Sequence, residues 1–366
     1  MTDKIKRTSL FSKHEALGAR IVPFAGFEMP LQYEGVIKEH LAVRTTAGVF
    51  DVSHMGEFIV KGKNAKNFLN FVTINDVSKI EIGQAQYSAM CYEDGGIIDD
   101  LLIYRYNDYY MLVVNASNID KDFNWLNQHL LDDVTIENRS DEIGLIALQG
   151  PKSREILTKI SESDISGLPF YYFLEGKVAG CDVTIARTGY TGELGFEIYG
   201  KNKDIPKVWD ALFNIGKPMG LVPSGLAARD TLRLEMKFCL YANDIDKTTH
   251  PYEAGLGWIT KVEKGDFIGR DAIIDRKEKM TRRLVCVEML DKAIPRQGYE
   301  IFIGAEKIGY FTSGGQSPSL QKGIGLAYIN SPHTKSGTEI EVEIRGTRKK
   351  AVIIKPPFYK DGTSLS

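Results

Sequence analysis

Two adjacent aspartates, Asp99 and Asp100, lie inside an otherwise apolar stretch, QYSAMCYEDGGIIDDLLIY. The segments on either side of EDGG are rich in aromatic and β-branched residues, while EDGG carries the residue types that a tight turn requires. The sequence therefore predicts a β-hairpin with strands over Tyr87–Tyr92 and Ile97–Tyr106.

Successive side chains of a strand point to opposite faces, so Asp99 and Asp100 cannot share one environment. Apolar residues occupy both parities of the second strand: Ile97, Leu101 and Ile103 on one, Ile98, Leu102 and Tyr104 on the other. We therefore expect the strand to be covered on both faces and one carboxylate to point inward, where an unpaired charge is costly. The pattern alone leaves open a structural carboxylate, which caps a loop or pairs with an arginine, and a functional one.

Composition excludes several classes of protein. The 366 residues carry 43% hydrophobic and 26% charged side chains with a formal charge of -2, which is typical of a globular protein with two or three domains and argues against a nucleic-acid partner. The four cysteines have no CxxC spacing, so we expect no metal site and no disulfide framework. Because no apolar run reaches signal-peptide or membrane-spanning length, we expect a cytoplasmic protein with no membrane contact.

The order of patterns along the chain predicts two α+β regions followed by an all-β domain. Pro23–Gly35 is rich in Gly and Pro and is expected to be an irregular aromatic loop. A strand interrupted at SHMG is expected over Val49–Val60, and a helix over Gly225–Met236 with Arg229 and Arg233 one turn apart. The later short strands are typical of a small barrel. The predicted regions are 1–140, 141–280 and 281–366.

Two histidines are expected to be structural. His14 lies in a short predicted helix near the N-terminus and is expected at the surface. His54, in DVSHMGEF, has no Ser, Cys or paired carboxylate at a catalytic spacing, so a hydrogen-bonded structural role is favoured. Signatures of dinucleotide, P-loop, zinc-peptidase and serine-hydrolase sites are absent from the sequence, and no nucleotide cofactor is expected.

Glu197 is the second candidate site residue. In LGFEIY the apolar side chains alternate with Gly195, Glu197 and Tyr199, so Glu197 points away from the apolar set, beside a glycine that leaves room. A carboxylate there can accept two hydrogen bonds from a flat heterocycle, and a distant arginine suits a ligand's own carboxylates; together these fit a pterin with a glutamate tail. The alternative is a solvent-facing glutamate.

Many motifs, in order along nearly the whole chain, resemble one family. The chain is similar to the aminomethyltransferases, or T-proteins, of the glycine cleavage system. The segments that carry the resemblance are FAGFEMP, FDVSHMGEF, QYSAMCYEDGGIIDDL, QGP, RTGYTGELGFE, GLAARDTLRLE, HPYEAGLGW, TSGGQSPSL and PPFY.

The resemblance implies an α+β protein of three domains in a cloverleaf around a central folate channel, the third being a β-barrel. Tetrahydrofolate would accept the methylene of an aminomethyl group carried on the dihydrolipoyl arm of the lipoylated H-protein. The products would be 5,10-methylenetetrahydrofolate, ammonia and the reduced arm. The resemblance also implies functional links to glycine decarboxylase (P-protein) and dihydrolipoyl dehydrogenase (L-protein).

By motif, the resemblance assigns the catalytic role to Asp100, the second aspartate of IIDDL, and the pterin edge to Glu197. Six further positions are implied as folate-binding or pocket residues: Tyr190, Arg229, Tyr87, Met55, Asn115 and Tyr359.

Two other folate-binding families are alternatives. The folate-binding half of sarcosine or dimethylglycine oxidases accompanies a flavin domain whose glycine motif does not occur in this sequence. A non-catalytic, accessory relative of the iron-sulfur assembly type would carry a KGCYxGQE-like motif, whereas the corresponding segment, GYTGELGFE, has no cysteine.

Overall fold

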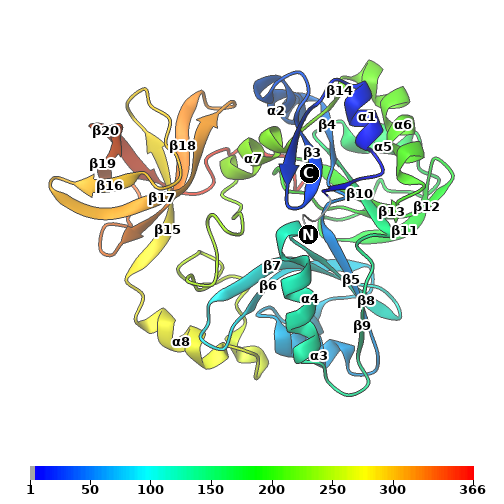
Figure 1. Cartoon of the computed structure of the whole chain (residues 1–366), viewed down its shortest axis with the longest axis horizontal. Helices are drawn as coiled ribbons and strands as arrows, with labels where there is room; N and C mark the ends of the chain where they lie inside the picture. Colours follow the sequence, from blue (N-terminus) through cyan, green and yellow to red (C-terminus); the bar gives the residue numbers. More distant parts are fainter. Residues whose placement is uncertain (1–4) are drawn as a thin grey trace.

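The computed structural model describes residues 5–366, which form three lobes around a common centre (Figure 1). Two lobes are sheets covered by helices, and the third is a closed barrel of strands. The predicted combination of α+β regions with a C-terminal barrel is therefore confirmed. Among the helices of residues 5–366, none has both the length and the apolar character needed to cross a bilayer.

The first lobe contains a five-stranded sheet in the order β6-β7-β8-β5-β9. Its helices, α3 (Ala65–Val72) and α4 (Ile119–Gln128), lie across one face, where their apolar side chains pack against Phe58, Leu101 and Leu112. The strands of this sheet are β5 (Gly56–Lys61), β6 (Gln84–Cys91), β7 (Ile97–Arg105), β8 (Tyr109–Val114) and β9 (Thr135–Asn138).

The predicted hairpin is confirmed as the antiparallel pair β6 and β7, but it contains a bulge at Ile98. The register moves from Cys91 opposite Ile97 to Met90 opposite Asp99. A bulge inserts one residue and breaks the alternation of faces. Ile98 therefore joins the cluster beneath α3 and α4, whereas Ile97 packs in a separate cluster toward the barrel, which corrects the simple parity assignment.

The second lobe contains a six-stranded sheet in the order β11-β12-β13-β10-β4-β14. On one face, α5 (Ser153–Thr158) and α6 (Ile205–Gly216) bury a cluster that includes Trp209. The other face shares a cluster with the first lobe's sheet. The strands are β4 (Ala47–Asp51), β10 (Ile143–Gln149), β11 (Phe173–Val178), β12 (Cys181–Ala186), β13 (Gly195–Lys201) and β14 (Leu221–Pro223).

The expected strand Val49–Val60 is two strands in two different sheets. β4 pairs with β10 and β14 in the second lobe, whereas β5 pairs with β8 and β9 in the first. The SHMG interruption is where the chain crosses between lobes. The division drawn at residue 140 therefore does not follow the sheets, because apolar periodicity identifies a strand and not its partner.

Pro23–Gly35, expected to be irregular, instead forms most of a β-hairpin. Strands β2 (Arg20–Phe24) and β3 (Phe27–Gln32) pair antiparallel, and β1 (Lys6–Arg7) pairs with β3. The connecting residues Ala25 and Gly26 both have positive φ, 47° and 82°, as a two-residue hairpin turn requires. The prolines are tolerated because β2 is an edge strand and Pro30 lies opposite a register shift.

The third lobe is a barrel closed in the order β15-β18-β17-β16-β19-β20, so it has no free strand edge. Helix α8 (Arg270–Glu278) precedes it. Its strands are β15 (Arg282–Met289), β16 (Glu300–Ile303), β17 (Glu306–Ser317), β18 (Lys322–Asn330), β19 (Glu339–Ile344) and β20 (Thr347–Ile354).

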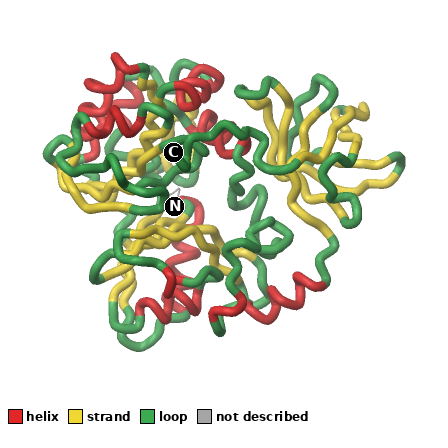
Figure 2. Tube along the Cα trace, turned by 180° about the vertical axis from the view of Figure 1, so that it is seen from behind, coloured by secondary structure: helices red, strands yellow, loops and turns green. Residues whose placement is uncertain are grey.

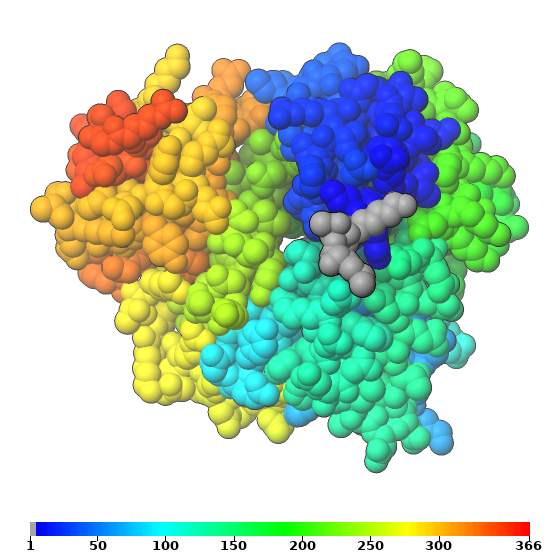
Figure 3. Space-filling view, in the orientation of Figure 1, coloured from blue at the N-terminus to red at the C-terminus, as the bar shows by residue number. Residues whose placement is uncertain are grey.

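Residues 236–269, here called the linking segment, connect the second lobe to α8 mainly through loops and turns (Figure 2). Its apolar residues pack in one cluster with Ile74 and Ala89 of the first lobe and with Leu284 and Leu326 of the barrel. In the space-filling view a narrow gap is visible between the yellow-green linking segment, the first lobe and the dark blue N-terminal part of the chain (Figure 3).

A buried ion pair holds helix α7 (Leu226–Glu235) against the barrel. Arg233 Nη1 lies 2.6 Å from Asp244 Oδ2, and its Nη2 donates to Ser313 Oγ on β17 at 2.9 Å. Both charged side chains are almost completely buried. The Tyr328 hydroxyl on β18 donates to the Asp244 carbonyl, so one charge pair joins α7, the linking segment and two barrel strands.

We expect Arg233→Gln to lower the free energy of unfolding by about 3–5 kcal/mol, because Asp244 would remain buried as an uncompensated charge. Urea unfolding of the whole chain measures the loss. The matched control is Arg283→Gln on β15, whose exposed side chain predicts a change within about 0.5 kcal/mol. Equal effects of the two substitutions would contradict the role given to the buried pair.

Candidate active site

Asp100 lies on β7, held between two other predicted site residues. The Tyr87 hydroxyl donates to Asp100 Oδ2 at 2.8 Å, and Asn115 Nδ2 donates to Oδ1 at 2.9 Å. Burial, followed by the charge of neighbouring Asp99, raises the pKa of Asp100 to about 7. The structure thus brings Asp100, Tyr87 and Asn115 together around a carboxyl group that titrates near neutral pH.

Asp99 points to the opposite side of the sheet, toward α4, and is fully buried. Its Oδ2 accepts the Asn115 backbone N–H at 3.1 Å, and its Oδ1 accepts Asn115 Nδ2 at 2.8 Å and Asn118 Nδ2 at 2.7 Å. The structural reading left open for this aspartate pair therefore fits Asp99. Asn115 Nδ2 contacts both carboxylates, so it links the two faces of β7.

Glu197, on β13, is buried and does not face solvent, which removes the alternative considered from the sequence. Its Oε2 accepts Thr188 Oγ1 at 2.6 Å and lies 3.3 Å from the Tyr199 hydroxyl and 3.5 Å from that of Tyr104. Tyr104 comes from β7 of the first lobe, so the carboxylate is fixed from both sheets. Among residues 5–366, these hydrogen bonds all use Oε2, which leaves Oε1 for a ligand.

Arg229 and Tyr190 lie next to each other. The Arg229 guanidinium is 4.7 Å from the centroid of the Tyr190 ring, and that ring stacks on Phe238 at 5.6 Å and 23°. Burial lowers the pKa of Arg229, and Glu197 opposes this shift more than any other group. Burial raises the pKa of Tyr190, and Asp100 adds to the increase. Arg229 and Tyr190 therefore lie within electrostatic reach of the two candidate carboxylates.

Two residues near this group were not predicted: Tyr171, which is partly buried, and Glu57. Burial raises the pKa of Tyr171, and Glu197 and Asp100 both add to the shift, so Tyr171 lies within reach of both carboxylates. Tyr171 lies in a loop with a φ of 65°, outside any strand or helix, so no periodic pattern in the sequence marks it. Glu57 on β5 is fully buried, and no donor among residues 5–366 reaches either oxygen. Burial and then Glu197 raise its pKa well above the usual value, so Glu57 is neutral.

His54 is buried, as a structural residue would be, but its Nδ1 has no hydrogen-bond partner within the described chain. Burial and the charge of Arg229 lower its pKa to about 4, so the ring is neutral at pH 7. The expectation of a surface position for His14 is wrong. His14 is fully buried, with Nε2 2.8 Å from Asp51 Oδ2 and Nδ1 2.9 Å from the Tyr33 hydroxyl, because α1 (Phe11–Ala16) packs onto the second lobe.

The two remaining predicted residues have different surroundings. Met55 packs against the apolar cluster shared by the two sheets, which also contains Val113 and Tyr104. Tyr359 instead lies under Arg44, with 4.1 Å between the guanidinium and the ring centroid, and its backbone N–H donates to Glu235. The described contacts of Tyr359 thus do not bring it to Asp100 or Glu197.

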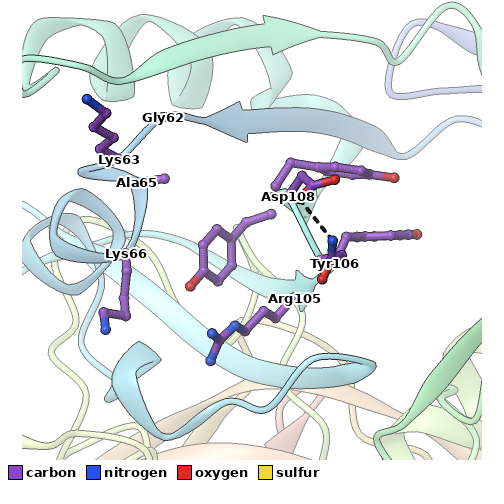
Figure 4. Close-up of a pocket in the computed structure, with 10 residues that line it drawn as sticks. Gly62, Lys63, Ala65, Lys66, Arg105, Tyr106 and Asp108 are labelled. Atoms are coloured by element: carbon purple, nitrogen blue, oxygen red, sulfur yellow. Dashed lines mark hydrogen bonds between the residues drawn. The ribbon is translucent and has the colours of Figure 1, made fainter.

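A pocket of about 200 Å³ lies at the far end of β7 and includes Lys63, Lys66 and Arg105 (Figure 4). Arg105 is five residues from Asp100, or roughly 16 Å along a strand. This pocket contains none of the predicted site residues. Within residues 5–366, no group of three or more His, Cys, Asp and Glu side chains is arranged to hold a metal ion.

Known protein families and individual proteins match this chain over nearly its whole length. Residues 10–264 match the GCVT N-terminal domain, and residues 282–360 match the glycine cleavage T-protein C-terminal barrel domain. Aminomethyltransferases of Chloroherpeton thalassium and a Geobacillus species are each 51% identical over 97% of this chain and 99% of theirs.

A solved structure, glycine cleavage system aminomethyltransferase T from Bartonella henselae, is 34% identical and superposes with a TM-score of 0.92 over 98% of this chain and 99% of that one. The matched domains, the sequence identity and the shared fold give one answer: this chain belongs to the glycine cleavage T-protein family.

Proposed function

We propose that this chain is an aminomethyltransferase that transfers the methylene of an aminomethyl group from the dihydrolipoyl arm of a lipoylated H-protein to tetrahydrofolate. The products are 5,10-methylenetetrahydrofolate, ammonia and the reduced arm. The observation that carries the proposal is the Asp100 carboxyl, held by Tyr87 and Asn115 in a chain whose relatives at 51% identity are named aminomethyltransferases.

In the proposed reaction, the departing ammonia leaves positive charge on the methylene carbon before the folate nitrogen takes it up. A fixed carboxylate stabilises such a charge without having to reorganise. At about 4 Å and an effective dielectric near 20, the attraction is roughly 4 kcal/mol before desolvation is subtracted. Asp100 must be ionised for this role, and its pKa of about 7 allows that above neutral pH.

The residues around Glu197 fit the proposed acceptor. Its carboxylate uses Oε2 for hydrogen bonds within the chain, so Oε1 can accept N–H groups from the edge of a pterin. Arg229, beside Tyr190, supplies a cation that suits the carboxylates of a folate tail. These side chains would bind and orient the acceptor, and Asp100 would act on the one-carbon unit.

An accessory, non-catalytic folate-binding role is the less favoured alternative. Its cysteine motif does not occur in this sequence, and the relatives that match over nearly the whole chain carry a transferase name. We also propose, from the family, a functional link with glycine decarboxylase and dihydrolipoyl dehydrogenase, and a cytoplasmic location.

Asp100→Asn is expected to keep the fold and folate affinity but to lower methylenetetrahydrofolate formation by at least about 100-fold, because the amide cannot stabilise a cation. The measurement is turnover of aminomethylated H-protein with tetrahydrofolate, alongside folate binding by calorimetry. Asp94→Asn in the adjacent exposed turn is the matched control. Turnover like that of the wild type in Asp100→Asn would refute the assigned role.

Tyr87→Phe is expected to move the acidic limb of the kcat/KM profile to higher pH. The Tyr87 hydroxyl donates to Asp100 and lowers its pKa, so its loss lets that pKa rise above about 7. At any pH on the acidic limb, a smaller fraction of Asp100 is then ionised. The rate therefore reaches its high-pH plateau at a higher pH than in the wild type. Rates measured from pH 5.5 to 9 test the shift, and an unchanged or lower midpoint would contradict it.

A further inference from the structure

The carboxyl groups of Asp99 and Asp122 form a pair behind Asp100, on the α4 side of the sheet. Asp122, on α4, is fully buried, and no donor among residues 5–366 comes within hydrogen-bond distance of either oxygen. The nearest cation, Lys121 Nζ, is 4.0 Å from Oδ1 and donates instead to the Ile98 carbonyl and to the Tyr241 hydroxyl at 3.0 Å. A carboxylate with so few donors in a dry site is costly.

Within the described chain, the side chain in hydrogen-bond contact with Asp122 is the carboxyl of Asp99. Two carboxyl groups in hydrogen-bond contact need a proton between them, because neither ionised group can donate. The donors decide which residue carries the proton. Burial raises the pKa of Asp99 as well, but Asp99 accepts three N–H groups, from the Asn115 backbone, Asn115 Nδ2 and Asn118 Nδ2, which oppose that rise and favour its charged form.

We propose that Asp122 and Asp99 share one proton, carried by Asp122, and that this acid–carboxylate pair is a positioning device that fixes the Asn115 amide against Asp100. The proposal rests on the function proposed for Asp100. Burial, and then the negative charge of Asp99, raise the pKa of Asp122 to about 11, in agreement with the donor count.

The pair acts on Asp100 through the orientation of one amide. The amide group of an asparagine can flip by 180° about its last side-chain bond, which exchanges the positions of its oxygen and nitrogen. With a charged, acceptor-only Asp99 on one side and Asp100 on the other, only the Nδ2 group fits between them, and it donates to both. The Asp99 charge also raises the pKa of Asp100. Asp122 and Asp99 are thus positioning residues, because they act on Asp100 through Asn115.

The ionisable groups packed around this pair are few. Asp99 and Asp100 come from β7, Lys121 and Asp122 from α4, Tyr92 from the turn that follows β6, and Tyr241 from the linking segment. The only cation in this set is Lys121, whose own pKa burial lowers. Any pH effect that the pair has on the reaction therefore passes through Asp100.

The test compares Asp122→Asn, whose amide can donate to Asp99 as the protonated acid does, with Asp122→Leu, whose side chain branches at the same atom but is larger and has no donor. Asp120→Asn, an exposed change on the same helix, is the control. For each full-length protein we would measure kcat and KM for tetrahydrofolate from pH 5.5 to 9, thermal unfolding, and the infrared C=O band of protonated carboxylic acids at pH 8.

We expect Asp122→Asn to lose one protonated-carboxyl band yet keep kcat within about twofold and an unchanged pH profile. In Asp122→Leu, Asp99 loses the hydrogen bond that most opposes the effect of its burial, so its pKa rises further and it takes up the proton itself. Asp100 then loses a neighbouring charge and its pKa falls. The acidic limb should then move to lower pH, and kcat should fall about tenfold or more with KM nearly unchanged. A folded Asp122→Leu protein with the pH profile and kcat of the wild type would overturn the proposal.

The infrared result separates this inference from the proposed function. If the wild type forms no methylenetetrahydrofolate but the band is present at pH 8 and missing in Asp122→Asn, the shared proton stands and the proposed function fails. If the wild type is active and Asp122→Asn removes no band, Asp122 is ionised and the inference fails. Should Asp122→Leu not fold, the band and the pH profile of Asp122→Asn still decide the outcome.

Discussion

The side-chain amide of Asn115 is shared by two carboxyl groups on opposite faces of one strand, and the geometry around Asp100 depends on that contact. The bulge at Ile98 makes it possible, because it fixes which faces the next two side chains take. Asp99 then meets the helix layer and Asp100 the space between the sheets. Since Asn115 directly follows β8, the neighbouring strand supplies the group that joins the two environments.

The distance between the two candidate site carboxylates, Asp100 and Glu197, is set by sheet packing. Asp100 belongs to β7 of the first lobe and Glu197 to β13 of the second, and one apolar cluster fills the space between these sheets. Tyr104, on the same face of β7, lies 2.9 Å from the Tyr199 hydroxyl and also reaches Glu197. This polar contact therefore fixes the position of one sheet relative to the other at the site, in addition to the apolar packing between them.

The elements that depend on local pattern were predictable from the sequence: the hairpin around EDGG, the helix that carries Arg229 and Arg233, and the barrel strands. What depended on distant partners was not. The segment around SHMG reads as one broken strand, because nothing local shows that its halves pair in different sheets. The hairpin around Ala25 and Gly26 is not predicted, because the many Gly and Pro residues of this segment indicate an irregular loop. Its turn depends on positive φ angles at these two residues.

The candidate site divides in the same way. The motifs identified Asp100, Tyr87 and Asn115, which are joined by hydrogen bonds, but Tyr359 has other neighbours. His14 is buried by contacts with Asp51 and Trp209, which are remote in the sequence, so its helical position suggested a surface residue. Tyr171 and Asp122 gave no signal for the same reason: their importance lies in what packs against them.

The buried carboxyl groups differ in charge because the number of donors around each differs. Glu57 and Asp122 have no donor within the described chain, and both are neutral. Burial raises the pKa of Asp99 as well, but three N–H donors and one shared acid oppose that rise and favour its charged form. Asp100 has two side-chain donors and a charged neighbour, and it lies between these extremes, with a pKa of about 7. A carboxyl group in that position can hold negative charge when a cation forms beside it, without a permanent arginine partner that would compete for that charge.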